Sequence, residues 1–337
     1  GLAAWAAVKG IDVVATGDFT HPGWFAHLHE GLLPAEEGLY RLKPDPGFDY
    51  AALLPEGLQP GRHPEEIRFI LSAEISCIYK RGGRVRKVHN LLYAPDMETV
   101  RRINTALANL GNISSDGRPI LGLDSRDLLE IVLEHSEQAF LVPAHIWTPW
   151  FSLFGSKSGF DRIEDCFADL SGHIFALETG LSSDPAMNRL ISALDRYTLI
   201  SNSDCHSPAK LGREANIFET GLDYFSLRAA LREPCDAAGR QRFLATVEFF
   251  PEEGKYHCDG HRKCGVCLEP QETRNLQGLC PVCGKDLTVG VLHRVLELAD
   301  RTEPSYPASS PQVHSLIPLA EIISELLDVG AASNRVM

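Results

Sequence analysis

Residues 67–95, IRFILSAEISCIYKRGGRVRKVHNLLYAP, decide the fold because two apolar, β-branched runs flank a Gly82-Gly83 pair. Such runs predict strands, and a glycine pair between them indicates a turn. Each run also carries a side chain that can bind a metal, Glu74 in the first and His89 in the second. The stretch therefore predicts two strands that bear metal-binding side chains.

The same pattern recurs along the chain, with helix-like segments between. AFLVPAHIW places His145 after an apolar run, LISNSDCHSP places Asp204 and His206, and VVATGDFTHP places Asp18 and His21. Alternating strands and helices predict an α/β fold with a mainly parallel sheet. Polar residues at successive strand ends predict a β/α barrel that gathers them at one face. One such residue is usually a turn former, but their recurrence favours a metal site, and carboxylates with imidazoles suit zinc, manganese or iron.

The composition sets limits on function. The chain has 337 residues, 44% of them hydrophobic, and a net charge of −13, so a nucleic-acid partner would have to meet a local basic patch. One candidate patch leads directly into His89, although it is equally well read as a solvated hairpin tip; it consists of Lys80, Arg81, Arg84, Arg86 and Lys87. No apolar run is long enough to span a membrane.

Nine cysteines are present, and four of them form two CxxC pairs. We predict that Cys264, Cys267, Cys280 and Cys283 hold a structural zinc ion, because two such pairs place four thiolates around one ion. His257, Cys258 and His261 lie nearby and are alternative ligands. Cysteine used in this way is typical of a reducing compartment, so we expect a cytoplasmic protein.

The domain organisation follows from shifts in composition. We predict a catalytic barrel over residues 1–250, a zinc-binding ribbon over 251–290 and a helical C-terminal region over 291–337. Residues 22–66 are rich in proline and glycine and predict a long loop over the barrel mouth or an inserted lobe. The chain begins with Gly1 and a helix-like segment, so we expect a preceding strand to lie before residue 1 and both natural ends to extend further.

Several stretches resemble the endonuclease Q family of the polymerase and histidinol phosphatase (PHP) superfamily. They include TGDFTHPGW, SAEIS, KVHNL, PAHIWTPWFSLFGSKSGF, ISNSDCHSP and DGHRKCGVC, and the similarity covers essentially the whole chain. The resemblance implies a distorted, TIM-like β/α barrel that binds up to three metals. It also implies cleavage of DNA on the 5′ side of uracil, hypoxanthine, xanthine and abasic sites. The superfamily carries an HxH motif on its first strand, whereas this chain begins with the helix-like segment that would follow that strand.

The resemblance also implies roles for individual residues. Glu74 would bridge two metals, His89 and His145 would complete one of them, and Asp204 would hold a second. A third would be held by His206 with either Asp18 or His21. The metals would be Zn²⁺, with Mg²⁺ or Mn²⁺ as options for catalysis. Aromatic residues just past His145 would stack on bases or, alternatively, pack in the core; they are Trp147, Trp150, Phe151 and Phe154.

Two other functions remain open at this level. One is a PHP-type phosphatase that acts on a small phosphomonoester, although such a substrate needs neither a ribbon nor a helical tail. The other is a non-catalytic DNA-binding scaffold, which the retention of five potential ligands disfavours. We expect a monomer whose partner is damaged DNA.

Overall fold

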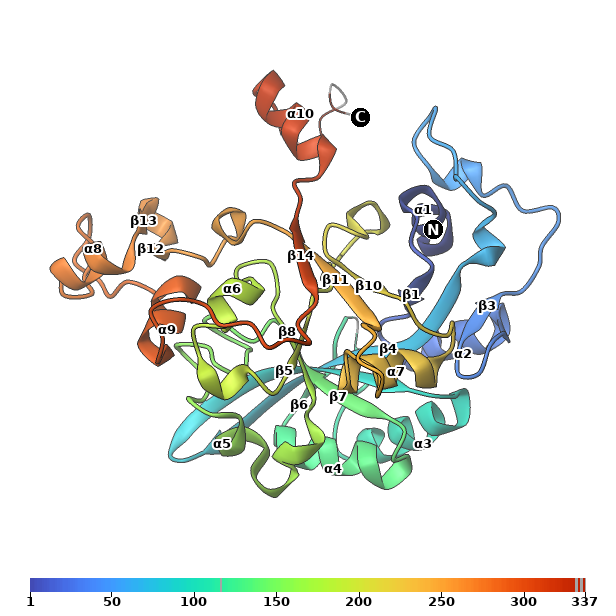
Figure 1. Ribbon diagram of the computed structural model, residues 1–337, viewed down its shortest axis with the longest axis horizontal. Helices are drawn as coiled ribbons and strands as arrows, with labels where there is room; N and C mark the ends of the chain where they lie inside the picture. The colour runs from blue at the N-terminus through green and yellow to red at the C-terminus, as the bar shows by residue number, and fades with distance from the viewer. Residues whose placement is uncertain (116, 331–332, 334–335, 337) are drawn as a thin grey trace.

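The computed structural model describes residues 1–115, 117–330, 333 and 336 of the chain, and its strands gather in four separate sheets (Figure 1). The helices are α1 (Leu2–Lys9), α2 (Pro22–Gly31), α3 (Met97–Ala108), α4 (Ser125–His135), α5 (Ile163–Phe167), α6 (Pro185–Asn188), α7 (Tyr224–Arg232), α8 (Pro270–Asn275), α9 (Val291–Leu298) and α10 (Leu319–Leu327). The strands are β1 (Val13–Ala15), β2 (Leu32–Pro34), β3 (Tyr40–Leu42), β4 (Arg68–Arg81), β5 (Arg84–Ala94), β6 (Ile120–Leu121), β7 (Phe140–Pro143), β8 (Ala176–Glu178), β9 (Thr198–Ile200), β10 (Ala215–Phe218), β11 (Phe243–Glu248), β12 (Asp259–His261), β13 (Val266–Leu268) and β14 (Gln312–Ser315).

A hairpin of β4 and β5 forms the centre of the largest sheet. The two strands pair antiparallel along their length, with Arg81 opposite Arg84 at the tip. Gly82 and Gly83 connect them with φ values of 60° and 73°, which glycine adopts at no steric cost and which suit a two-residue hairpin turn. The two predicted strands and the turn between them are thus confirmed.

The sheet topology differs from the predicted parallel barrel. Strands β1 and β6 pair parallel with β4, but β2–β3, β3–β4, β4–β5 and β5–β7 are antiparallel. The prediction of a mainly parallel sheet is wrong because a two-residue turn can join only antiparallel neighbours. The other sheets are β8–β9, β10–β11–β14 and β12–β13, and the four sheets of the described residues do not close into one ring. Barrel closure is therefore not confirmed.

The largest sheet is buried on both faces where β5 meets β7. Successive side chains alternate between faces, so Leu92 and Leu141 join one apolar cluster while Tyr93 and Phe140 join another. Apolar residues of α3 and α4 cover the first face, and Figure 1 shows both helices along that side of the sheet. Tyr224 of α7 belongs to the second cluster. Double-sided burial holds the strands that carry the site in fixed positions.

Residues 22–66 are not one long loop, so of the two alternatives the loop is wrong. They contain α2, β2 and β3, and β3 extends the largest sheet by pairing with β4. Tyr40 lies opposite Phe69, and its hydroxyl accepts a hydrogen bond from the main chain of Met97 at 3.1 Å. Tertiary pairing with β4 thus orders a segment whose composition indicated a loop.

The C-terminal region is not purely helical. Besides α9 and α10 it contains β14, which pairs parallel with β11 so that Ala245 lies opposite Gln312. The division into three domains stays a prediction, but β14 ties residues 291–337 to the main body. Helix α10 projects from that body (Figure 1). Among the described residues, no helix combines the length and apolar character that a membrane crossing requires.

Candidate metal centres and nucleic-acid face

Three of the predicted metal ligands meet in one compact cluster. The Glu74 Oε1 atom lies 2.9 Å from Nδ1 of His89 and 3.4 Å from Nε2 of His145, and the two imidazole nitrogens lie 3.1 Å apart. Ligand bonds of about 2.1 Å in a tetrahedral arrangement place donor atoms about 3.4 Å apart. The cluster is therefore close to the size that one transition-metal ion needs, and its carboxylate and imidazole donors suit zinc or manganese.

The cluster does not form at strand ends as the sequence pattern predicted. Glu74 and His89 lie within β4 and β5, and only His145 follows a strand end, that of β7. Ser76 lies opposite His89 in the hairpin, and Glu74, two residues from Ser76, shares its face. The hairpin register therefore brings these two ligands together.

Left-handed backbone conformations mark three of the predicted ligands. Asp18, His145 and Asp204 have φ values of 46°, 29° and 41°. Such values are uncommon for residues other than glycine and persist where the surrounding structure enforces them, often at functional sites. The three residues follow β1, β7 and β9 respectively. The shared backbone feature supports a common role.

Asp18 lies within electrostatic reach of the cluster. Burial raises the pKa of its carboxyl, as does the charge of Glu74, whereas Arg118, His21 and His206 lower it. His21 is the N-cap of α2, and its Nδ1 atom accepts a hydrogen bond from the main-chain N–H of Trp24 at 3.3 Å. Since the capping contact involves only Nδ1 of His21, whether Asp18 or His21 is the ligand of the DFTH segment stays a prediction.

Asp204 and His206 lie on the loop that follows β9. Burial lowers the pKa of His145, but its contact with Glu74 outweighs burial and raises the pKa, with a smaller contribution from the charge of Asp204. Nδ1 of His206 lies 3.1 Å from the main-chain oxygen of Asp204. The metal-ligand roles of Asp18, Asp204 and His206 remain predictions, because the compact donor set found at this site among the described residues consists of Glu74, His89 and His145.

Hydrogen bonding sets the charge state of the cluster. Burial favours protonation of Glu74, but the close contacts with His145 and His89 outweigh burial and hold the pKa of Glu74 well below its usual range. Burial lowers the pKa of His89 to about 4, although Glu74 opposes this shift. An ionised carboxylate beside a neutral imidazole is the protonation state in which both can bind a cation.

Two residues of this site were missed by sequence reasoning. Arg118 donates from Nη1 to Oε1 of Glu74 and, at 2.8 Å, to Nδ1 of His89. Glu178, at the end of β8, accepts the main-chain N–H of His145 at 2.8 Å and the side-chain amide of Asn202 at 2.7 Å. Burial raises the pKa of Glu178 to about 7. The only sequence signal for Glu178 was its place at the end of an apolar run, FALE.

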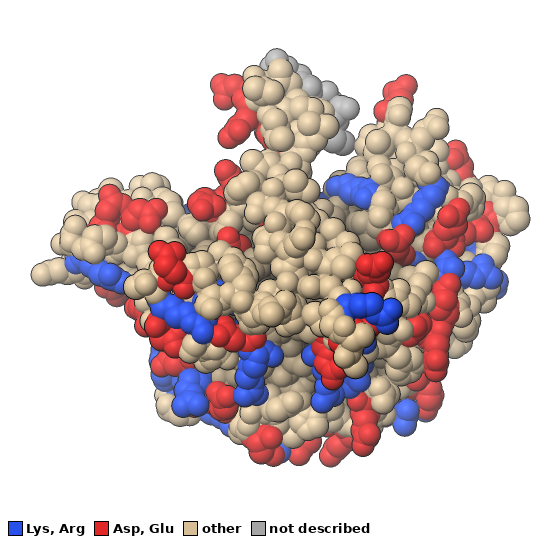
Figure 2. All heavy atoms as spheres, in the orientation of Figure 1, with Lys and Arg blue, Asp and Glu red and all other residues tan. Residues whose placement is uncertain are grey.

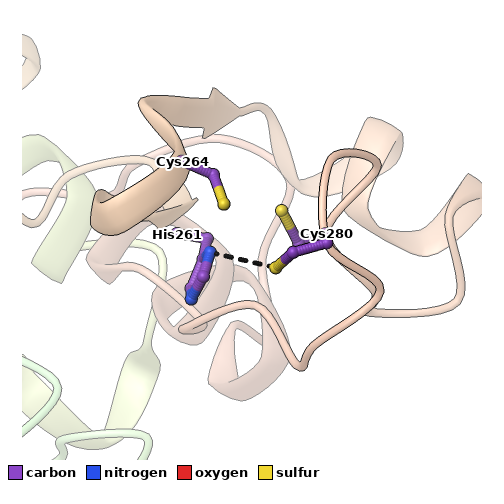
Figure 3. Close-up of side chains that lie close together, drawn as sticks. His261, Cys264 and Cys280 are labelled. Carbon is purple, nitrogen blue, oxygen red and sulfur yellow. Dashed lines mark hydrogen bonds between the residues drawn. The ribbon is translucent and has the colours of Figure 1, made fainter.

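The ribbon contains a second possible metal site, made of one histidine and three cysteines. Ligand atoms of His261, Cys264, Cys280 and Cys283 all lie within 4.8 Å of one another, and Figure 3 shows the first three pointing toward a common centre. Nδ1 of His261 and Sγ of Cys283 are 3.5 Å apart. Zn–N and Zn–S bonds of about 2.1 and 2.3 Å imply about 3.6 Å between such atoms in a tetrahedral site, so the residues fit zinc.

The four-cysteine site stays a prediction, and in the structure His261, rather than Cys267, lies with the other three cysteines. Cys267 lies on β13 opposite Gly260, one residue before His261, and interacts with Cys258 instead. A sequence pattern could have indicated His261, because a glycine follows the second ligand of each pair. His261-Arg-Lys-Cys264-Gly265 matches Cys280-Pro-Val-Cys283-Gly284, and both glycines have left-handed φ values, 64° and 68°.

The hairpin tip carries the predicted basic patch on two faces. Lys80 and Lys87 share the face of Glu74 and His89 because each is an even number of residues from a ligand on its strand. The Lys87 ammonium lies 5.0 Å from the ring centre of Phe151, which in turn lies 4.8 Å from that of His89. These contacts form a continuous surface from the metal cluster toward the tip.

The three arginines of the patch lie on the other face of the hairpin. Arg81 donates to the main-chain oxygen of Cys166 at 2.6 Å, and the Arg86 guanidinium stacks over Phe160 at 4.2 Å from its ring centre. Arg84 is exposed at the tip. Two of the three arginines thus serve the packing of the hairpin.

Acidic and basic side chains are interspersed on the face drawn in Figure 2.

The aromatic residues after His145 separate into core and surface. Trp147 is 1% exposed, packs on Phe154 and donates to Asn188 at 2.8 Å. The core alternative therefore applies to Trp147, which cannot stack on a base from this position. Trp150 is 39% exposed, and Phe151 packs against His89. Of these aromatic residues, Phe151 thus contacts the cluster through His89, and Trp150 is exposed to solvent.

Known proteins that are similar to this chain align with it over different shares of their lengths. No model of a known protein family matches it. It is 35% identical over 193 residues to the uncharacterized protein MJ0043 of Methanocaldococcus jannaschii, an alignment that covers 56% of the chain and only 23% of that protein. It is 29% identical over 321 residues to the uncharacterized protein YqxK of Bacillus subtilis, covering 92% of the chain and 72% of that protein.

Two solved structures resemble the chain over nearly its whole length. One is the lesion-specific endonuclease PfuEndoQ from Pyrococcus furiosus, with a TM-score of 0.77 and 32% identity over 98% of this chain and 74% of that one. The other is endonuclease Q in complex with a 27-mer duplex substrate with an abasic lesion at the active site, with a TM-score of 0.80 and 31% identity over 99% and 75%. This protein therefore belongs to the endonuclease Q family.

Proposed function

We propose that this protein is a metal-dependent endonuclease of DNA repair that hydrolyses the phosphodiester on the 5′ side of a damaged nucleotide. The observation that carries the proposal is the compact donor set of Glu74, His89 and His145. The solved neighbours act on lesions, and one holds an abasic-site duplex. Uracil, hypoxanthine, xanthine and abasic sites are the proposed lesions.

The residues would divide the chemistry between them. Glu74, His89 and His145 would hold one ion, while Asp18, Asp204 and His206 would contribute to further ions. A bound divalent metal supplies a Lewis acid for the phosphate and lowers the pKa of a water molecule. We propose that this metal is Zn²⁺, Mg²⁺ or Mn²⁺.

The surrounding side chains would bind and orient the substrate. Lys80 and Lys87 lie on the ligand face of the hairpin and would contact DNA phosphates. Trp150 and Phe151 would support a nucleotide turned out of the duplex, which costs least at an abasic or mispaired position. The second site, His261 with Cys264, Cys280 and Cys283, would hold a structural zinc ion.

The test is an end-labelled duplex assay with each lesion in turn, in Mg²⁺, Mn²⁺ or Zn²⁺, beside a generic phosphomonoester. We expect a nick on the 5′ side of the lesion and none in the undamaged duplex. Asp204→Ala should abolish the nick yet retain lesion binding, because removal of a carboxylate near the phosphates does not weaken their attraction to the protein. Hydrolysis of the phosphomonoester alone would indicate a phosphatase, and lesion binding without any hydrolysis would indicate a scaffold. The monomeric state and the cytoplasmic location stay predictions.

A further inference from the structure

The side chain of Arg118 touches two of the three clustered ligands with a single nitrogen. Its Nη1 atom donates to Oε1 of Glu74 and to Nδ1 of His89, the latter at 2.8 Å. These two atoms, 2.9 Å apart, belong to residues of the compact donor set and face each other within it. The guanidinium also lies within electrostatic reach of Asp18, where it partly opposes the rise that burial causes in the pKa of that carboxyl. Arg118 therefore provides positive charge at the point where the predicted ligands converge.

While the Arg118 guanidinium contacts Glu74 and His89, a metal ion cannot bind to the same two atoms. A nitrogen within hydrogen-bonding distance of both donor atoms leaves no room for an ion between them. Two positive charges a few ångströms apart also repel strongly in a partly buried site. Binding of the ion therefore requires the guanidinium to leave Glu74 and His89.

The local structure allows the side chain to move while its backbone stays in place. The next residue, Pro119, accepts the main-chain N–H of Ser76 at 2.9 Å and so fixes the segment to the edge of β4. The Arg118 side chain is itself 27% exposed. A long, flexible stem can carry the charged head outward from a fixed Cα. Once displaced, the guanidinium would remain beside the metal centre, at the surface.

We propose that Arg118 and the catalytic metal exchange places, so that metal binding releases the Arg118 guanidinium to bind a phosphate oxygen of the DNA. The proposal rests on the endonuclease function proposed above. A planar guanidinium binds phosphate through two parallel hydrogen bonds. Arg118 thus balances the charge of the ligands before the metal binds and contacts the substrate afterwards. The exchange makes the phosphate contact dependent on the metal.

The first test measures metal affinity without using activity. The protein receives one equivalent of Zn²⁺ for its ribbon and is then titrated with Mn²⁺, with free Mn²⁺ followed by electron paramagnetic resonance. Arg118→Ala should bind Mn²⁺ about tenfold more tightly, because no charge-assisted hydrogen bond to Glu74 has to be broken. Loss of Mn²⁺ binding in Glu74→Gln would show that the titrated Mn²⁺ binds at the cluster that contains Glu74. The matched control is Arg102→Ala, which removes an exposed arginine of α3 paired with Glu98 and should leave Mn²⁺ affinity unchanged.

The second test measures the phosphate contact. An abasic-site duplex with a phosphorothioate on the 5′ side of the lesion is bound over a range of salt concentrations, with and without Mn²⁺. With Mn²⁺, Arg118→Ala should lower the slope of log affinity against log salt by about one phosphate contact, whereas without Mn²⁺ the slope should not change. Arg118→Lys should restore most of the slope.

The outcomes separate this proposal from the proposed function. Unchanged or weaker Mn²⁺ affinity in Arg118→Ala would overturn the exchange. An equal loss of slope with and without Mn²⁺ would overturn the dependence of the contact on metal. If the protein nicks none of the lesion duplexes, the endonuclease proposal fails while the Mn²⁺ titration still decides whether Arg118 competes with the metal.

Discussion

Oε2 of Glu178 accepts a hydrogen bond from the main-chain N–H of His145 at 2.8 Å. His145 has a φ of 29°, a conformation that a residue with a side chain keeps only when other contacts hold it. The other oxygen of Glu178 accepts from Asn202, which lies on the loop that carries Asp204. A single buried carboxylate therefore connects two loops that bear predicted ligands.

Replacement of Glu178 should loosen the metal cluster without removing a ligand. We expect Glu178→Ala to weaken metal binding and activity by about 10- to 100-fold, which is typical when a residue that orients a ligand is lost. Glu178→Gln keeps an oxygen for the His145 N–H and should lose less than tenfold. Mn²⁺ titration measures the effect, and equal losses in the two variants would contradict a positioning role.

The ribbon offers a test between histidine and cysteine at one ligand position. His261→Ala should lose the ribbon zinc, whereas Cys267→Ser should retain it, because Cys267 lies outside the group of ligand atoms. The zinc content of each purified variant, measured by metal analysis, tests this prediction. Cys280→Ser should also lose zinc and unfold the ribbon, since metal binding contributes much of the folding free energy of so small a unit. Zinc loss in Cys267→Ser alone would restore the four-cysteine assignment.

The two faces of the hairpin tip should respond differently to mutation. Lys87→Ala should weaken DNA binding for all sequences and lower the salt slope by about one, because Lys87 shares the face of His89. Arg86→Ala should mainly lower stability, since Arg86 packs on Phe160 and donates to the main chain of Gly159. Fluorescence anisotropy and urea unfolding distinguish the two effects. A larger loss of DNA affinity in Arg86→Ala would place the DNA on the opposite face.

A buried carboxyl predicts how stability depends on pH. Glu214 is 3% exposed, and burial together with the charge of Glu248 raises its pKa to about 9. The folded state therefore retains a proton that the unfolded state releases above its ordinary pKa near 4.5. This contribution to stability is complete below that pKa and is lost as pH rises toward 9.

Glu214→Gln should remove this pH dependence. The free energy of unfolding of the wild type should fall between pH 5 and 9 by up to about 1.4 kcal/mol per pH unit from this group. The variant should show a flatter profile and greater stability at pH 8, as measured by urea unfolding. Glu219→Gln alters an exposed carboxyl and should keep the wild-type profile. A parallel profile for Glu214→Gln would show that this carboxyl is ionised in the folded protein.

The sequence by itself determined the features that rest on local patterns. The Gly82-Gly83 pair specifies a tight hairpin because only glycine adopts both left-handed angles easily. Glu74, His89 and His145 were identifiable because their side chains are metal ligands set in or after apolar runs, and the spaced cysteines indicated a ribbon. Each inference needs only a few neighbouring residues.

Only the tertiary structure decided which distant residues meet. Arg118 is 44 residues from Glu74 and Glu178 is 33 residues from His145, so no local period connects them. His261 meets Cys283 across 22 residues, and the buried indole of Trp147 donates to Asn188, 41 residues away. Strand pairing and side-chain packing are long-range contacts, and their free energy is gained only when the whole chain has folded.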